Sequence, residues 1–127
     1  MSQILVIDDE SDVRVYLQAL LEDEGYVVNV AQDCEEGAHF LDSCVPDLLI
    51  MDIIMPRQSG LDLYRNIRTT ERLKHVPVIM LSAVTKYRHQ FSEHFDDIPE
   101  PEDFIDKPFH KRIFLERVAS ILDEKRE

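Results

Sequence analysis

The chain has few of the residues and segments on which several classes of function depend. Its 127 residues contain no tryptophan, two cysteines and only three glycines, Gly25, Gly37 and Gly60. Glycines so scattered exclude the glycine-rich phosphate loop of a nucleotide-binding domain. No apolar run reaches the roughly 18 residues of a membrane span. The start of the chain has no basic segment followed by a long apolar core, so we expect a soluble, cytoplasmic protein without a signal peptide.

Positive charge is also scarce. The chain has 14 lysines and arginines against 26 aspartates and glutamates, and its formal net charge is −12. Such a charge repels phosphate backbones and anionic lipid surfaces at long range. We therefore expect no nucleic acid and no membrane among the partners of this chain alone. A mass of 14.9 kDa allows one compact domain with a hydrophobic core, which we expect to span residues 1–127.

The cysteines and histidines indicate neither a disulfide nor a zinc site. Cys34 and Cys44 lie ten residues apart on a predicted helix, or about 15 Å along its axis. This separation exceeds the reach of a disulfide, and we expect both thiols to be reduced. The five histidines have no zinc-binding spacing such as HExxH.

Apolar runs of strand length alternate with segments of helical period along the chain. The predicted strands span residues 4–8, 27–31, 47–52, 78–82 and 103–106. The residues expected on the core faces of the helices are Val13, Tyr16, Leu17, Leu20 and Leu21; Cys34, Ala38 and Leu41; Leu61, Tyr64 and Ile67; and Phe114, Val118, Ile121 and Leu122. Strands that are apolar on both faces are typical of a parallel sheet between two helix layers. The sequence therefore predicts a doubly wound five-stranded α/β fold.

Polar residues stand where the predicted strands end. Asp8 and Asp9 end the first strand, Asp52 the third and Ser82 the fourth, and Lys107 follows the fifth. In doubly wound sheets the carboxyl ends of the strands line the ligand site. A carboxylate there is costly unless it meets a cation, and a carboxylate-rich site that must also accept phosphate favours Mg²⁺. The simpler alternative is that Asp9 or Asp12 caps the following helix.

Four segments carry a resemblance to a known family. They are IDDE (residues 7–10), MDIIMP with GLDL (residues 51–63), VIMLSA (residues 78–83) and DKPF (residues 106–109). In this order they resemble the receiver domain of two-component response regulators, a family that includes the chemotaxis regulators. The resemblance covers nearly the whole chain and implies a flavodoxin-like sheet with strand order 2-1-3-4-5. It also implies that the chain is a phosphoprotein of a phosphorelay and not an enzyme. The reactions it catalyses on itself would be at most autophosphorylation and autodephosphorylation.

The resemblance implies roles for the residues at the predicted site. Asp52 is the expected phosphoacceptor, which takes the phosphoryl group from a partner histidine kinase or phosphotransfer protein. Asp9 and Asp52 are the expected direct Mg²⁺ ligands, the backbone carbonyl of Ile54 is a further ligand, and Asp8 stands nearer the outer shell. Lys107 is expected to pair with the phosphoryl group.

The same resemblance implies a switch that passes the signal to a downstream protein, whose identity the sequence does not specify. The hydroxyl of Ser82 is expected to move toward the new phosphoryl group, and Phe104 stands where the family has its switching aromatic residue. The Lys107–Pro108 peptide bond is expected to be cis.

Two other functions compete with this interpretation. A haloacid-dehalogenase type of enzyme also uses a strand-end aspartate, but it needs a second acid two positions later, where this chain has Ile54. The stronger alternative is a pseudo-receiver, a protein-interaction module that keeps the fold without phosphorylation. Whether the chain stands alone or is cut from a longer protein stays open.

Residues 84–103 depart from the family pattern. Tyr87, Phe91 and Phe95 have helical spacing and predict a short helix whose aromatic stripe either packs into the core or docks a partner. The acidic, proline-containing stretch 96–103 follows. Our hypothesis is that its acidic residues select a basic target; they include Glu100, Glu102 and Asp103.

Overall fold

The computed structural model describes residues 2–53, 60–82 and 98–126. The strands are β1 (Gln3–Ile7), β2 (Val27–Ala31), β3 (Leu48–Asp52), β4 (Val78–Ser82) and β5 (Asp103–Asp106). The helices in these ranges are α1 (Ser11–Glu22), α2 (Cys34–Ser43), α3 (Gly60–Thr69) and α5 (Lys111–Arg126). All strand pairs are parallel, and the sheet order is β2-β1-β3-β4-β5. The predicted flavodoxin-like fold is confirmed, with strand bounds within one residue of those predicted.

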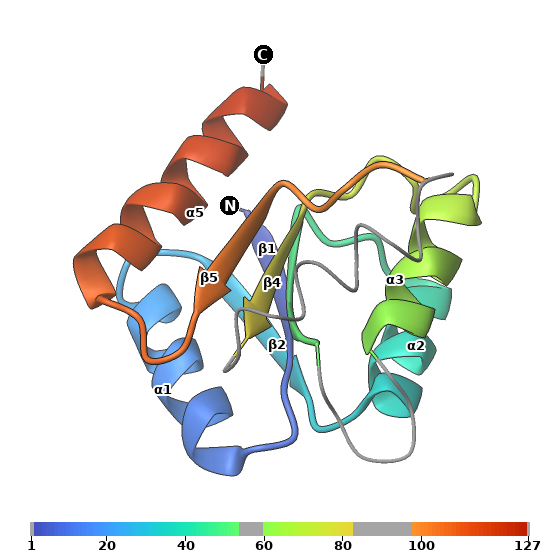
Figure 1. Cartoon of the computed structure of the whole chain (residues 1–127). Helices are drawn as coiled ribbons and strands as arrows, with labels where there is room; N and C mark the ends of the chain where they lie inside the picture. The colour runs from blue at the N-terminus through green and yellow to red at the C-terminus, as the bar shows by residue number, and fades with distance from the viewer. Residues whose placement is uncertain (1, 54–59, 83–97, 127) are drawn as a thin grey trace.

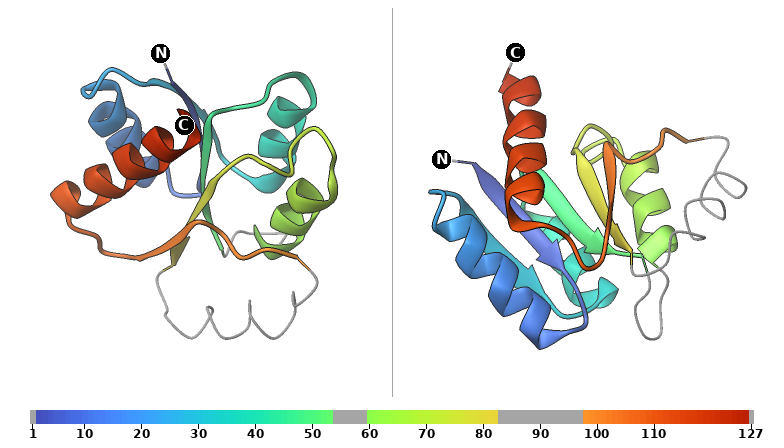
Figure 2. Two further views of the ribbon diagram at one scale, coloured as in Figure 1. Left: turned by 90° about the horizontal axis from the view of Figure 1, so that it is seen from above. Right: turned by 60° about the vertical axis from the view of Figure 1, so that its left-hand side comes forward.

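The sheet lies between two layers of helices. Helices α1 and α5 cover one face, and α2 and α3 cover the other (Figures 1 and 2). Because side chains alternate along a strand, β1 sends Ile4 and Val6 to the first face and Leu5 and Ile7 to the second. Both faces of the central strands are thus buried, which explains why their sequences are apolar throughout.

The helix termini follow local signals only in part. Asp33 caps α2, since its carboxylate accepts a hydrogen bond of 2.8 Å from the backbone N–H of Glu36. Gly25 follows α1 with a φ of 93°, a left-handed conformation that favours glycine. Neither Asp9 nor Asp12 caps α1, because the residue at that position is Glu10 and no side chain bonds there. The helix-cap alternative for these acids is therefore wrong.

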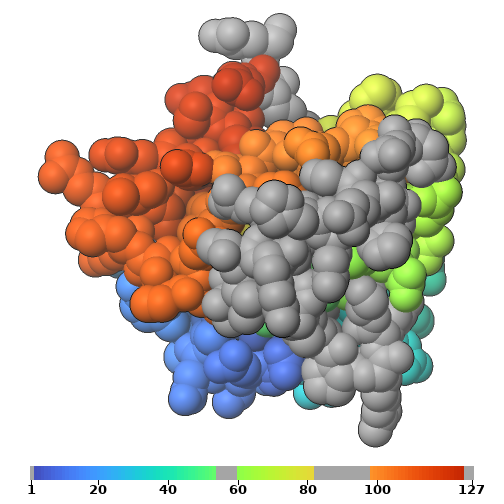
Figure 3. Space-filling model, viewed as in Figure 1, coloured from blue at the N-terminus to red at the C-terminus, as the bar shows by residue number. Residues whose placement is uncertain are grey.

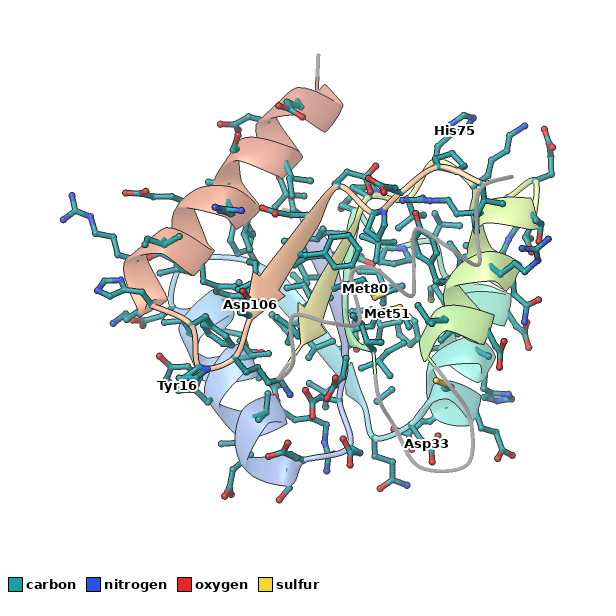
Figure 4. The ribbon with its side chains drawn as sticks, in the orientation of Figure 1. Tyr16, Asp33, Met51, His75, Met80 and Asp106 are labelled. Atoms are coloured by element: carbon teal, nitrogen blue, oxygen red, sulfur yellow. The ribbon has the colours of Figure 1, made fainter. Side chains whose placement is uncertain are left out.

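Tyr16 is the one predicted core residue of α1 that the structure leaves half in water. Its exposed fraction is 48%, whereas Leu17, Leu20 and Leu21 are buried. Figure 4 shows Tyr16 beside the turn between β5 and α5, where its ring lies 6.3 Å from that of Phe109. A tyrosine at the edge of an apolar stripe can pack its ring and keep its hydroxyl hydrated.

The expected thiol state is confirmed, because Cys34 and Cys44 are both free. Cys44 lies just beyond α2 rather than on it, since the helix ends at Ser43. None of the helices within the described ranges combines the length and apolar character that crossing a membrane requires.

Candidate functional site

Four carboxylates meet at the carboxyl edge of the sheet. Asp8 follows β1, and Asp52 is the last residue of β3, which is the neighbour of β1 in the sheet. Asp9 and Glu10 continue the chain toward α1. One carboxylate oxygen from each of these four residues lies within 4.8 Å of the others. Sequence reasoning predicted the first three acids and missed Glu10, although it is the last residue of the IDDE motif.

The site has a buried floor and an open rim. The exposed fraction is 0% for Asp8 and 7% for Asp52, whereas Asp9 and Glu10 are exposed. Asp8 is held from two sides: its Oδ1 accepts a 2.9 Å hydrogen bond from the backbone N–H of Glu10, and its Oδ2 accepts one of 2.9 Å from Lys107. The carboxylates are therefore fixed below and accessible from solvent above.

Lys107 brings the positive charge that the buried acids need. It follows β5, yet its Nζ reaches back to lie 2.9 Å from Asp8 Oδ2 and 3.0 Å from Asp52 Oδ2, with Glu10 Oε1 at 3.9 Å. The Lys107–Pro108 peptide bond is cis, as predicted. Burial alone lowers the pKa of Lys107, but the hydrogen bonds to Asp8 and Asp52 outweigh burial and raise the pKa above its ordinary value. The ammonium is therefore charged at neutral pH.

The charges at this site do not balance. Four carboxylates and one ammonium leave an excess of three negative charges within a few ångströms. Clustered carboxylates repel one another unless a further cation is bound. The donors are all carboxylate oxygens, with no histidine or cysteine among them, which is the donor set of a hard divalent ion such as Mg²⁺. The residues present thus fit the ion that the sequence predicts.

Gly60 packs closely against the backbone of Asp52 and Ile53 at the end of β3. Its backbone N–H donates a 2.9 Å hydrogen bond to the carbonyl of Ile53. A Cβ at this position would overlap the backbone carbonyl oxygens of Asp52 and Ile53. The start of α3 therefore presses on the end of β3 at a distance that only glycine permits. The sequence analysis gave Gly60 no part in the site.

Of the remaining predicted site residues, the structure describes Ser82 and Phe104. Ser82 ends β4, the neighbour of β3, where Leu81 pairs with Asp52. Phe104 is partly buried on β5 and packs against the core between the sheet and the α2–α3 layer. The predicted carbonyl ligand Ile54 lies outside the described residues, as do Tyr87, Phe91 and Phe95 of the predicted aromatic helix.

The acidic residues before and within β5 are used inside the molecule. Glu102 accepts hydrogen bonds from Arg68 and from the backbone N–H of Val78, both at 2.7 Å. Asp103 pairs with Arg117 of α5 at 2.6 Å. Glu102 and Asp103 thus each have a cationic partner within the chain, and the hypothesis that the acidic stretch selects a basic target stays a prediction. Glu100 remains exposed.

Comparison with known proteins places the chain in a family. The response regulator receiver domain model matches residues 4–119. The transcriptional regulatory protein CpxR of Escherichia coli K12 is 36% identical over 126 residues, which cover 96% of this chain and 50% of CpxR. The virulence transcriptional regulatory protein PhoP of Salmonella typhimurium LT2 is 28% identical and is covered to 52%. The chain thus spans about half the length of the curated relatives it matches.

Solved structures agree in fold. The response regulator TrrA of Thermotoga maritima, solved in complex with Mg²⁺ and BeF, is 33% identical with a TM-score of 0.82, and the match covers 95% of this chain and 99% of TrrA. The receiver domain of a histidine kinase from Syntrophus aciditrophicus is 28% identical with a TM-score of 0.87, covering 98% and 92%. Since the family model matches nearly the whole sequence, this chain belongs to the response regulator receiver domains of two-component signal transduction.

Proposed function

We propose that the chain works as one receiver domain over residues 1–127 and switches a docking surface when Asp52 is phosphorylated in the presence of Mg²⁺. The observation that carries this proposal is the meeting of Asp8, Asp9, Asp52 and Lys107 at one edge of the sheet. Receiver domains as a family act as phosphoacceptor switches, and TrrA, a relative by sequence and fold, was solved with Mg²⁺ and BeF.

The acidic residues would have different roles in binding the metal ion. Asp9 and Asp52 would hold Mg²⁺ directly, with the backbone carbonyl of Ile54 as a further ligand, as the family resemblance implies. Asp8, fully buried and bonded to Lys107, would support the ion from the outer shell. When bound, Mg²⁺ neutralises the charge on the oxygens of the phosphoryl group during transfer.

Asp52 is the nucleophile in this proposal. One of its carboxylate oxygens attacks the phosphorus of a phosphohistidine on the partner, the phosphorus–nitrogen bond breaks, and the electron pair leaves with the imidazole. The product on this chain is an aspartyl phosphate. Lys107, now bonded to Asp8 and Asp52, lies close enough to pair with the phosphoryl group as a point charge.

The conformational switch would run from β4 to β5. Ser82 ends β4, and Met80 of the same strand pairs with Phe104 on β5. We propose that the Ser82 hydroxyl binds the phosphoryl group and that the ring of Phe104 moves in response. A downstream protein would then recognise the changed surface.

A groove beside the site offers a protein partner a place to bind. It has a volume of about 650 Å³ and runs from Lys107 to α1, and its lining residues are Glu10, Asp12, Val13, Tyr16, Lys107, Pro108 and Phe109. Figure 3 shows α1 and the region where β5 leads into α5 together on one face of the molecule. The groove is lined by apolar, aromatic and acidic residues together with Lys107, and we propose that a histidine kinase or phosphotransfer protein binds there. A cytoplasmic location, where thiols stay reduced, agrees with the two free cysteines.

Phosphorylation from a small phosphodonor tests the proposal. The chain is incubated with acetyl phosphate and Mg²⁺, and its intact mass is measured. We expect the mass of one base-labile phosphoryl group to be added to the native chain and to the control Asp123→Asn, an exposed acid on α5. Asp52→Asn and EDTA should both abolish the gain.

Two results would contradict the proposal. Equal phosphorylation of Asp52→Asn would place the acceptor elsewhere. No phosphorylation of the native chain by acetyl phosphate or by any histidine kinase would favour the pseudo-receiver alternative.

A further inference from the structure

We propose that Arg68 is a positioning residue. It holds the start of β5 at the amino edge of the sheet, where the parallel strands begin, and thereby sets the position of Lys107 at the carboxyl edge, where they end. The proposal rests on the function proposed above, in which Lys107 must meet the phosphoryl group on Asp52. Nothing in the sequence marked Arg68, which has the spacing of an ordinary α3 residue four positions after Tyr64.

Arg68 is a buried cation with four hydrogen-bond partners. Its side chain is 3% exposed. Its Nε donates to the hydroxyl of Tyr64 at 2.8 Å, its Nη1 donates to the backbone carbonyls of Lys74 and Val76, and its Nη2 donates to Glu102 at 2.7 Å. A planar guanidinium can serve all these acceptors at once, and a lysine ammonium cannot.

Tyr64 and Glu102 extend this network to the chain that enters β5. The Tyr64 hydroxyl donates a 2.6 Å hydrogen bond to the carbonyl of Pro99, and burial raises the pKa of Tyr64 above its ordinary value, so the hydroxyl keeps its proton. Glu102 accepts from Arg68 and also from the backbone N–H of Val78, the first residue of β4, at 2.7 Å. The start of β5 is thereby bonded to α3 and to the start of β4.

Among the described residues, β5 is an edge strand of four residues, Asp103–Asp106, that pairs only with β4. The bonds of Glu102 hold its start, and the ion pair of Asp103 with Arg117 ties it to α5. At about 3.3 Å per residue, Glu102 and Lys107 are separated by roughly 16 Å of extended chain. A shift at the start of so short a strand is carried to its end, where Lys107 Nζ must lie close to two carboxylates.

The metal ligands do not depend on β5 in the same way. Asp8 and Asp9 directly follow β1, and Asp52 ends β3; both strands lie in the interior of the sheet. Loosening β5 should therefore misplace Lys107 without dispersing the acids. It should also weaken the competition of Lys107 with a metal ion for Asp8 and Asp52.

The experiment compares the native chain with Arg68→Met and Arg68→Lys. Three quantities are measured on each folded protein: amide hydrogen exchange in β5, the dissociation constant for Mg²⁺, and the rate of phosphorylation by acetyl phosphate at saturating Mg²⁺. For Arg68→Met we expect exchange in β5 to be about tenfold faster and phosphorylation about tenfold slower, with Mg²⁺ bound as tightly as in the native chain or more tightly. Arg68→Lys should fall between them, because it keeps the charge and loses the fork.

Arg72→Met is the matched control. Arg72 also donates both Nη groups to a backbone carbonyl, that of Leu41 at the end of α2, but it makes no hydrogen bond to β5 that the structure describes. We expect native exchange in β5 and a native phosphorylation rate for this variant. If Arg68→Met does not fold, Glu102→Gln replaces it, because its amide oxygen can still accept from Val78 while the charge is lost.

The outcomes separate this inference from the proposed function. Native exchange and a native rate in Arg68→Met would overturn the inference, and so would a parallel loss of Mg²⁺ affinity and rate, which indicates general loosening. Failure of the native chain to accept phosphate would overturn the proposed function, whereas the exchange measurement would still show whether Arg68 holds β5.

Discussion

The carboxyl edge of the sheet, where the parallel strands end, and the amino edge, where they begin, both contain buried charged residues, but the charges balance at only one of them. At the carboxyl edge four carboxylates meet, three of them pair with Lys107, and two of the four acids are open to solvent. At the amino edge one arginine meets one glutamate, and carbonyl and hydroxyl oxygens take its other donors. A cation that binds at the first edge would relieve its excess negative charge. At the amino edge the charges of Arg68 and Glu102 balance, so this network needs no ligand. It links α3 and the start of β4 to the start of β5.

This contrast predicts opposite signs when single charges are removed. At the balanced edge every partner is needed, so neutralising one group should destabilise the fold. At the acidic edge some charges oppose folding, so removing the right one should stabilise the metal-free protein.

Glu102→Ala should give the largest loss of stability. It leaves Arg68 buried without its counter-ion and the Val78 N–H without its acceptor, and we expect the free energy of unfolding to fall by about 3 kcal/mol. Urea denaturation measures the change. The control is Glu71→Ala, whose carboxylate is 89% exposed and pairs only with Lys74 among the described salt bridges, and which should change stability by less than about 0.5 kcal/mol. Equal effects of the two variants would contradict a structural role for the Arg68 network.

Lys107→Met should destabilise the fold less, and mainly when no metal is bound. In EDTA we expect a loss of about 2 kcal/mol, because Asp8 stays fully buried without a cation while the open rim lets water relieve part of the cost. Mg²⁺ should restore much of the loss and should bind more tightly than in the native chain. Thermal unfolding with and without Mg²⁺ checks this, with the exposed Lys111→Met as control. A loss that Mg²⁺ leaves unchanged would argue against shared use of the acids.

Asp9→Asn should have the opposite sign. Asp9 is exposed, and one of its oxygens lies within 4.8 Å of those of Asp8 and Asp52, so in EDTA its removal should stabilise the chain by up to about 1 kcal/mol. Mg²⁺ should then no longer raise the melting temperature. Asp12→Asn is a strict comparison, because Asp12 lies in the first turn of α1, where a negative charge favours the helix and its loss costs a few tenths of a kcal/mol. A destabilised Asp9→Asn in EDTA would break the contrast between the two edges.

The buried thiol of Cys34, to whose raised pKa the charge of Asp52 contributes least, should give the smallest effect. Burial raises the pKa of its thiol from 9.0 to about 11, and the charges of Asp33, Asp62 and Asp52 add to the shift. Because the pKa is higher in the folded state, the contribution to stability is complete below pH 9.0 and is lost as the pH rises toward 11. Between pH 8 and pH 9 we expect the free energy of unfolding to fall by about 0.4 kcal/mol more in the native chain than in Cys34→Ala. Identical pH profiles would show that Cys34 does not sense this environment.

The sequence was sufficient for the fold because buried parallel strands leave unbroken apolar runs such as LLIM before Asp52. It was also sufficient to bring Asp8, Asp9, Asp52 and Lys107 together, since strand ends converge at one edge of the sheet whatever the side-chain details. The Arg68 network was beyond sequence reasoning, because Glu102 is 34 residues away and its acidic neighbours look like a solvated loop. Tyr16 was misplaced for a related reason: a helical period gives the face of a residue but not how far the opposing layer extends.

A crystal structure of the chain with Mg²⁺ and beryllofluoride tests the central claim most directly. The account predicts beryllofluoride on the carboxylate of Asp52, an ion shared by Asp9 and Asp52, and Lys107 Nζ turned from the carboxylates to the fluorides. An ion bound away from Asp9 and Asp52, or beryllofluoride on any other residue, would contradict it.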